Sequence, residues 1–144
     1  MKAHNQNEPR GRSAHPMLLS LMRAEYVIQR AMRGEGPRQP GSFLGERSGV
    51  EVAISDEDIV VALDHRTAVR LIPDKDIKQI VGLSTDGLRM RTVREIAELL
   101  GKSRSSVHRM QHLGLEMVAA LLTLVVRKRL EDEEAKQRSN AYAA

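Results

Sequence analysis

The segment TVREIAELLGKSRSSVHRM, residues 92–110, constrains the fold more tightly than any other part of the chain. Thr92 stands three residues before Glu95, a capping-box pattern that predicts the start of a helix. Gly101 predicts the end of that helix, because glycine readily adopts the left-handed conformation found there. Ser103 then predicts the cap of a second helix. The segment therefore predicts two helices joined by a tight turn.

The other residues of this segment fit a helix-turn-helix. Ala97 is small where the two helices would approach most closely. The apolar residues at the sealing positions are Ile96, Leu100, Val107 and Met110. With these inward, the residues left facing outward are Arg104, Ser105, His108, Arg109 and His112, with Ser106 at the boundary.

The outward side chains are donors suited to phosphates and base edges. We expect Arg104 and Arg109 to read base edges. Contacts to phosphates are expected from Arg91, Arg94, Lys102 and Ser103. The predicted DNA-contacting set is therefore Arg91, Arg94, Lys102, Ser103, Arg104, Ser105, Ser106, His108, Arg109 and His112. Two amphipathic helices that only build a core would explain the apolar positions, but not these donors.

The distribution of charge agrees with an anionic partner. The 144 residues carry a net charge of +4. Residues 1–49 hold eight Lys and Arg against four Asp and Glu, and residues 89–115 hold six against two. Residues 50–88 are acidic instead, with four Lys and Arg against eight Asp and Glu. The basic segments are thus the ones expected to meet a polyanion, although solvated charged faces would give the same counts.

Composition limits the chemistry open to the chain. Aromatic residues are 2% of the sequence and cysteine is absent, so the core must be aliphatic and cysteine-dependent catalysis or metal binding is excluded. The richest apolar stretch, residues 117–126, is about half the length of a membrane-spanning helix. With a polar N-terminus that does not fit a signal peptide, the sequence predicts a cytoplasmic protein without a membrane partner.

Three features resemble parts of enzymes, and each has a simpler explanation. Gly101-Lys102-Ser103 matches the end of a phosphate-binding loop, but Ile96 stands where that loop needs glycine. His108 and His112 are spaced like helical metal ligands, yet no third ligand is near in sequence. The acidic residues Asp56, Glu57, Asp58 and Asp64 include three that suit a helix start. We expect no catalytic residues, no metal and no cofactor.

The whole chain predicts a small all-α domain of about five helices. Residues 1–15 are expected to be a flexible arm, and residues 16–49 a helix from Pro16 to Gly34 with a loop rich in Gly and Pro. Residues 50–114 would form the helix-turn-helix domain, with a short extended segment at Val50, Val52 and Ile54, a helix from Ser55 to Pro73 and another from Asp74 to Gly82.

Residues 115–144 are expected to form a C-terminal helix and a frayed tail. Apolar residues surround this helix, so one face is expected to contact the domain and another a partner. A fully buried internal helix is the alternative. The candidate partner-contacting residues are Leu121 and Leu124 on this helix and Phe43 and Leu44 in the loop, although the loop pair would equally suit packing on the first helix.

A family resemblance rests on these same residues. The acidic-capped helix, the helix after it and IAELLGKSRSSV resemble region four of bacterial sigma factors over residues 55–110. With the first helix, the Ser-Phe-Leu-Gly loop and SDEDIVVALDHRTAVRL, residues 17–112 resemble the phage antitermination protein Q family of the lambdoid-phage type.

The resemblance implies a phage late-gene regulator in the cytoplasm of a bacterial host. Such a protein would bind double-stranded DNA through its helix-turn-helix, engage paused RNA polymerase with its sigma factor, and suppress termination. An activator of the ArpU or RinA kind resembles the same helices and would act on initiation. A protein that binds sigma factor or polymerase without a DNA site of its own is the third alternative, and a homo-oligomer is compatible with each.

Overall fold

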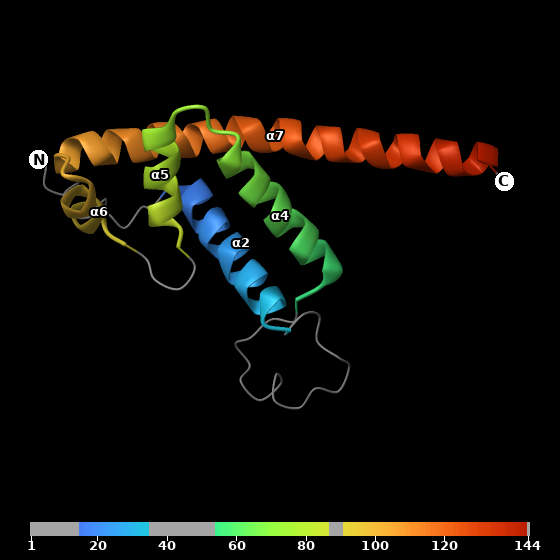
Figure 1. The fold of residues 1–144 in the computed structure, drawn as a ribbon, viewed down its shortest axis with the longest axis horizontal. Coiled ribbons are helices and arrows are strands. Elements are labelled where there is room, and N and C mark those ends of the chain that lie inside the picture. The colour runs from blue at the N-terminus through green and yellow to red at the C-terminus, as the bar shows by residue number, and fades with distance from the viewer. Residues whose placement is uncertain (1–14, 35–53, 87–90, 144) are drawn as a thin grey trace, which may run out of the picture.

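The computed structural model describes residues 15–34, 54–86 and 91–143 (Figure 1). In these ranges the chain forms five helices and no strand, which confirms the expected all-α fold. The helices are α2 (Pro16–Met32), α4 (Asp56–Arg70), α5 (Lys75–Ser84), α6 (Val93–Leu100) and α7 (Arg104–Ala143). The predicted contacts at Phe43 and Leu44, the arm before residue 15, and Val50 and Val52 lie outside the described residues.

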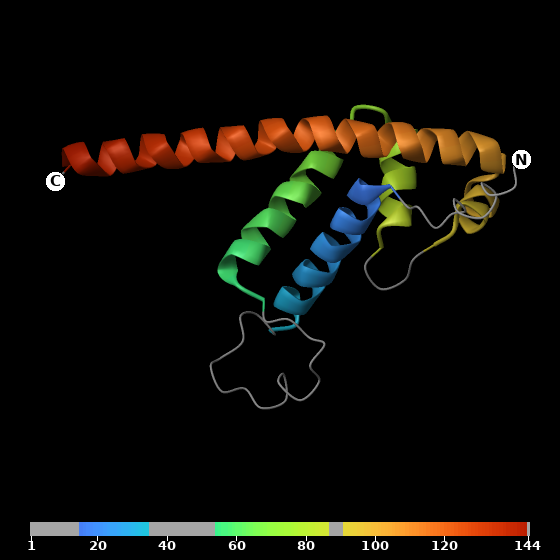
Figure 2. The same ribbon diagram turned by 180° about the vertical axis from the view of Figure 1, so that it is seen from behind.

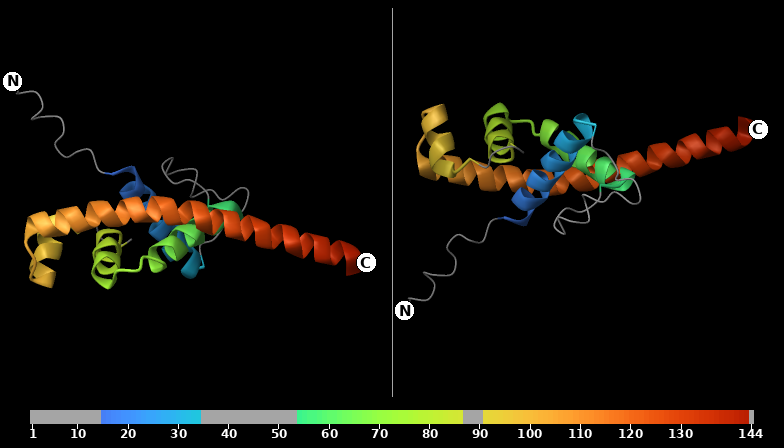
Figure 3. Two further views of the ribbon diagram at one scale, coloured as in Figure 1. Left: turned by 90° about the horizontal axis from the view of Figure 1, so that it is seen from above. Right: turned by 90° about the horizontal axis from the view of Figure 1, so that it is seen from below.

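Helix α7 runs the length of the molecule, and the other four helices lie along one side of it (Figures 1 and 2). Helices α5 and α6 meet its N-terminal half, while α2 and α4 pack against each other and meet its middle. The C-terminal end of α7 extends past all of them, as the views from above and below show (Figure 3).

The expected boundary at Gly114 is wrong. The predicted second helix of the helix-turn-helix and the predicted C-terminal helix are one continuous helix of 40 residues. Gly114 lies inside this helix and is buried where Val81 and Ile77 of α5 pack against it. The last residues of the chain, expected to fray, are helical as far as Ala143.

The predicted helix starts are confirmed in detail. The Ser55 hydroxyl accepts from the Asp58 N–H at 3.1 Å, and the Asp58 carboxylate accepts from the Ser55 N–H at 3.0 Å. This second bond lowers the pKa of Asp58. Thr92 and Glu95 make the same reciprocal pair.

Two other predicted boundaries need correction. Helix α5 continues through Gly82 to Ser84, because Ser84 is buried and its hydroxyl bonds to the Ile80 carbonyl within the helix. Ile54, expected to be extended, is in no strand and is buried in a cluster with α2 and α4.

Three apolar clusters hold the helices together. The first joins α2, α4, α5 and α7 through Leu21, Ala68, Ile72, Ile77, Val81, Leu115 and Val118. The second joins α2 to α4. The third contains Ile80, Ile96, Ala97 and Val107, so it fixes α6 and the start of α7 on α5. The helix-turn-helix is therefore packed onto the body rather than attached by a linker.

Candidate nucleic-acid interface

The turn between α6 and α7 has the local geometry that the sequence predicts. Gly101 has a φ of 66°, in the left-handed region that favours glycine. The Lys102 N–H donates to the Ala97 carbonyl at 3.0 Å and closes the end of α6. The Ser106 N–H donates to the Ser103 hydroxyl oxygen at 3.2 Å, so Ser103 caps α7 as expected.

The inner face of the helix pair is sealed by the predicted residues. Ile96, Ala97 and Val107 are buried, and Leu100 and Met110 pack against them half-buried. Ile80 of α5 completes this cluster. Because Val107 is fully enclosed, the opposite side of the first turns of α7 must face solvent.

That opposite side carries the predicted donors. Arg104, Ser105, His108, Arg109 and His112 are all exposed, and Ser106 is half-buried at the boundary. Among the described residues, neither Arg104 nor Arg109 makes an ion pair, so both guanidinium groups keep their donors for another molecule. The positive end of the α7 dipole lies at the same place.

The predicted phosphate contacts are less uniform. Arg94 is exposed and has only a long contact of 3.9 Å with Glu98. Arg91 is half-buried and its guanidinium donates to the Asp86 carboxylate at 3.1 Å, so a phosphate would have to compete with Asp86. Lys102 is half-buried beside the turn, and the Ser103 hydroxyl accepts a capping bond but keeps its own proton to donate.

His15 is a neighbour of this surface that the sequence did not reveal. Placed in the expected arm, it instead caps α2, since its Nδ1 accepts from the Met17 N–H at 3.0 Å. Its Nε2 lies 2.7 Å from Glu116 on α7, and this hydrogen bond lowers the pKa of Glu116. The His15 ring also packs edge-on against His112, with centroids 5.4 Å apart.

The four acidic residues considered in the sequence analysis stabilise the fold. Asp56, Glu57 and Asp58 form the first turn of α4, as expected. Asp64 is buried and accepts two bonds from Arg129 of α7, at 3.1 and 3.0 Å, which raises the pKa of Arg129. No group of three His, Asp or Glu side chains suited to a metal ion occurs in the part of the chain that the structure describes.

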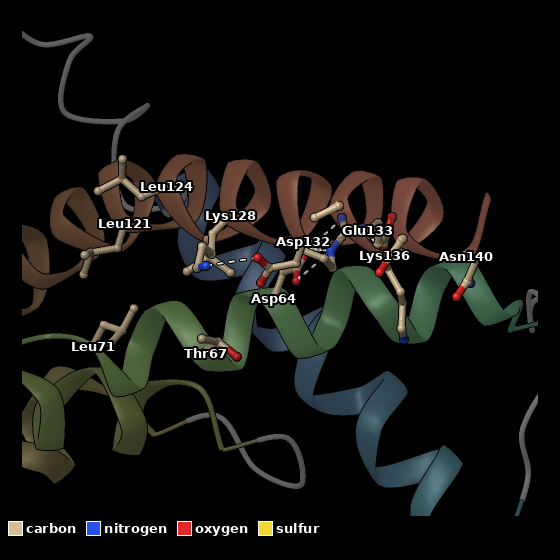
Figure 4. A pocket seen from close by; sticks show the side chains of 14 residues that line it. Asp64, Thr67, Leu71, Leu121, Leu124, Lys128, Asp132, Glu133, Lys136 and Asn140 are labelled. Atoms are coloured by element: carbon tan, nitrogen blue, oxygen red, sulfur yellow. Dashed lines mark hydrogen bonds and ion pairs between the residues drawn. The ribbon is translucent and has the colours of Figure 1, made fainter. Parts of the chain in front are cut away.

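A groove of about 960 Å³ runs between α4 and the C-terminal half of α7 (Figure 4). Both predicted partner-contacting leucines line it. Leu121 also packs against the first cluster, whereas Leu124 is 54% exposed. Leu71, directly after the end of α4, faces them, and the Asp64–Arg129 pair joins α4 and α7 further along. No sequence signal pointed to this groove, because it depends on how α4 meets α7.

Comparison of the chain with models of known protein families, with curated proteins and with solved structures found no match. Among the described helices, none combines the length and apolar character that crossing a membrane requires.

Proposed function

We propose that this protein binds double-stranded DNA through α6 and the first turns of α7 and regulates transcription at the site it binds. The observation that carries the proposal is the exposed row of Arg104, Ser105, His108 and Arg109, which lies opposite the sealed Val107. A helix that presents such donors at its N-terminal end suits the major groove of DNA.

The role proposed for each side chain follows from the contacts that it makes in the structure. Arg104 and Arg109 are without ion pairs among the described residues and are assigned to base edges. Lys102 and Ser103, next to the turn, are assigned to phosphates, with Arg94 beside them. Arg91 is already paired with Asp86, so it is the weakest candidate for a phosphate contact among these residues.

Selection from random DNA with the purified protein tests DNA binding. We expect one preferred sequence from the wild type and loss of that preference for Arg109→Ala. Arg138→Ala is the matched control, because Arg138 is equally an exposed arginine on α7 but lies near the far end. If the wild type enriches no sequence, the proposal of sequence-specific DNA binding is wrong.

The form of regulation is proposed from the resemblance to the antitermination protein Q family. We assign the protein to late-gene antitermination in a phage-infected bacterium, with RNA polymerase and its sigma factor as partners. Transcription by purified polymerase on a template with the selected site, a promoter and a terminator tests this. Read-through that rises only on templates with the site supports antitermination. More initiation with unchanged read-through would identify an activator, and an effect independent of the site would identify a polymerase-binding protein without a DNA site.

A further inference from the structure

The start of α2 lies against the side of α7 that carries the exposed donors. Arg109, His112 and Glu116 follow one another at spacings of three and four residues, so they form a row on one side of α7. This row lies opposite the sealed Val107. The His15 ring packs edge-on against His112, and its Nε2 lies 2.7 Å from the Glu116 carboxylate. In Figure 3 the first turn of α2 accordingly lies on the side of α7 away from α5 and α6.

The contact with Glu116 fixes the point where the chain enters α2. Residues 104–116 contain no other acidic residue, and a free carboxylate at the end of this row would repel phosphates. The Glu116 carboxylate is instead bound to the His15 ring. His15 is also held from its other side, because its Nδ1 caps α2 and the side chains of Met17 and Leu18 pack against the first apolar cluster. The beginning of α2 is therefore fixed next to the candidate DNA interface.

The sequence that leads to His15 is basic. Residues 1–14 hold three basic residues against one acidic residue, namely Lys2, Arg10 and Arg12 against Glu8. Residues 2–14 include no large apolar side chain, so their composition suits contact with a polyanion better than burial in a core. Arg12 is three residues from His15, and three residues span at most about 11 Å. Since a major groove is about 12 Å wide, the backbone of Arg12 stays within about one groove width of His15.

We propose that the DNA interface continues from α7 onto the segment before α2, where Arg10 and Arg12 bind phosphates beside those contacted by the helix-turn-helix. The inference rests on the proposed DNA binding and adds a second basic segment, distant from the first in sequence. Phosphate contacts carry no base information, so these two arginines strengthen binding to every sequence. His15 and Glu116 are positioning residues, because they hold this segment at the end of the donor row.

Binding titrations at several salt concentrations test the two arginines. On the sequence that the wild type selects, Arg10→Ala with Arg12→Ala should reduce the slope of the logarithm of the binding constant against the logarithm of the salt concentration by about two. Between about 50 and about 200 mM salt, the wild type should then lose about tenfold more affinity than the variant. The matched control is Arg127→Ala with Arg138→Ala, which removes the same charge from exposed positions far along α7 and should leave the slope unchanged.

The outcomes separate this inference from the proposed function. A wild type that binds the selected DNA with a slope that the Arg10 and Arg12 variant shares would overturn the inference alone. An equal fall in slope for the control pair would also overturn it, because the effect would then be one of net charge. A wild type that binds no DNA would overturn both proposals.

Directed cleavage of the DNA backbone tests where the segment lies. Because the chain has no cysteine, Ser13→Cys provides a single attachment point for an iron–EDTA group that cuts DNA close to it. We expect cuts at the edge of the selected sequence, and none from the same label on Ser139→Cys near the far end of α7. In a Glu116→Ala background the cuts from position 13 should spread over more nucleotides, since His15 loses its partner on α7. Absence of cuts from position 13 would contradict the extended interface, and an unchanged pattern in Glu116→Ala would contradict the positioning role.

Discussion

Gly114 of α7 lies against Val81 of α5 so closely that a Cβ on Gly114 would be 2.5 Å from the Val81 Cγ2. It would also be 2.7 Å from the Cγ2 of Ile77. Both neighbours are β-branched and stiff at χ1, so neither methyl group moves aside cheaply. The absence of a side chain at Gly114 is what lets α5 cross α7 and position the helix-turn-helix.

Gly114→Ala should therefore destabilise the protein although alanine favours helices. The overpacking costs about 1–3 kcal/mol, against a helix-propensity gain of at most about 1 kcal/mol. Gly82→Ala is the control, because Gly82 lies within α5 with no atom near its missing Cβ. We expect Gly82→Ala to stabilise by about 0.5–1 kcal/mol in urea unfolding. Equal effects of the two variants would contradict the close crossing.

Arg109→Ala and Lys102→Ala should weaken DNA binding in different ways. Loss of a base contact at Arg109 should cost about 1–3 kcal/mol on the preferred sequence and little on unrelated DNA. Loss of a phosphate contact at Lys102 should weaken binding to all sequences. It should also reduce the slope of the logarithm of the binding constant against the logarithm of the salt concentration by about one. Titrations at several salt concentrations separate the two. The assignment of roles fails if Arg109→Ala weakens binding to all sequences equally.

Asp64→Asn should lower the melting temperature by removing the charge that holds Arg129. Asp64 is buried, so its loss leaves the guanidinium without its main partner between α4 and α7. Glu133 also contacts Arg129, at 3.3 Å, but on the exposed side. Glu133→Gln should therefore have several times less effect in thermal unfolding. A comparable loss from both variants would mean that the buried contact is not the dominant one.

Stability should depend on pH through Glu116. The hydrogen bond from His15 lowers the pKa of Glu116 below its ordinary 4.5 in the folded protein. The carboxylate therefore contributes stability above that value, and the contribution is lost as the pH falls through the folded pKa. The urea midpoint of the wild type should exceed that of Glu116→Gln at pH 6–7, and the difference should shrink progressively as the pH falls below 4.5. In a His15→Ala background the same substitution should have a much smaller effect, because the hydrogen bond from His15 is the largest cause of the lowered pKa of Glu116.

The sequence predicted the features that depend on near neighbours. The caps at Ser55, Thr92 and Ser103 and the sealed face around Val107 follow from spacings of three and four residues, and the structure confirms them. The division of the chain after residue 114 missed the continuity of α7, because no local pattern shows that Gly114 lies inside a helix where another helix crosses.

The missed contacts all join distant parts of the chain. Asp64 and Arg129 are 65 residues apart, and His15 and Glu116 are 101 apart. No local pattern marks such pairs, since they form only when α2 and α4 settle on α7. The groove was missed for the same reason, although Leu124 on its wall was singled out from its apolar surroundings.

The unbroken course of α7 also restricts how its length can change. Each residue of an α-helix turns the following part by about 100° and advances it by about 1.5 Å. One residue inserted between Met110 and Leu121 would therefore swing Leu124 and everything after it away from α4, while Arg104 and Arg109 kept their place. Only insertions near whole numbers of turns, such as seven residues, would keep both ends in phase. Length variation among close descendants of this chain should accordingly fall beyond Tyr142 or in the connections between helices.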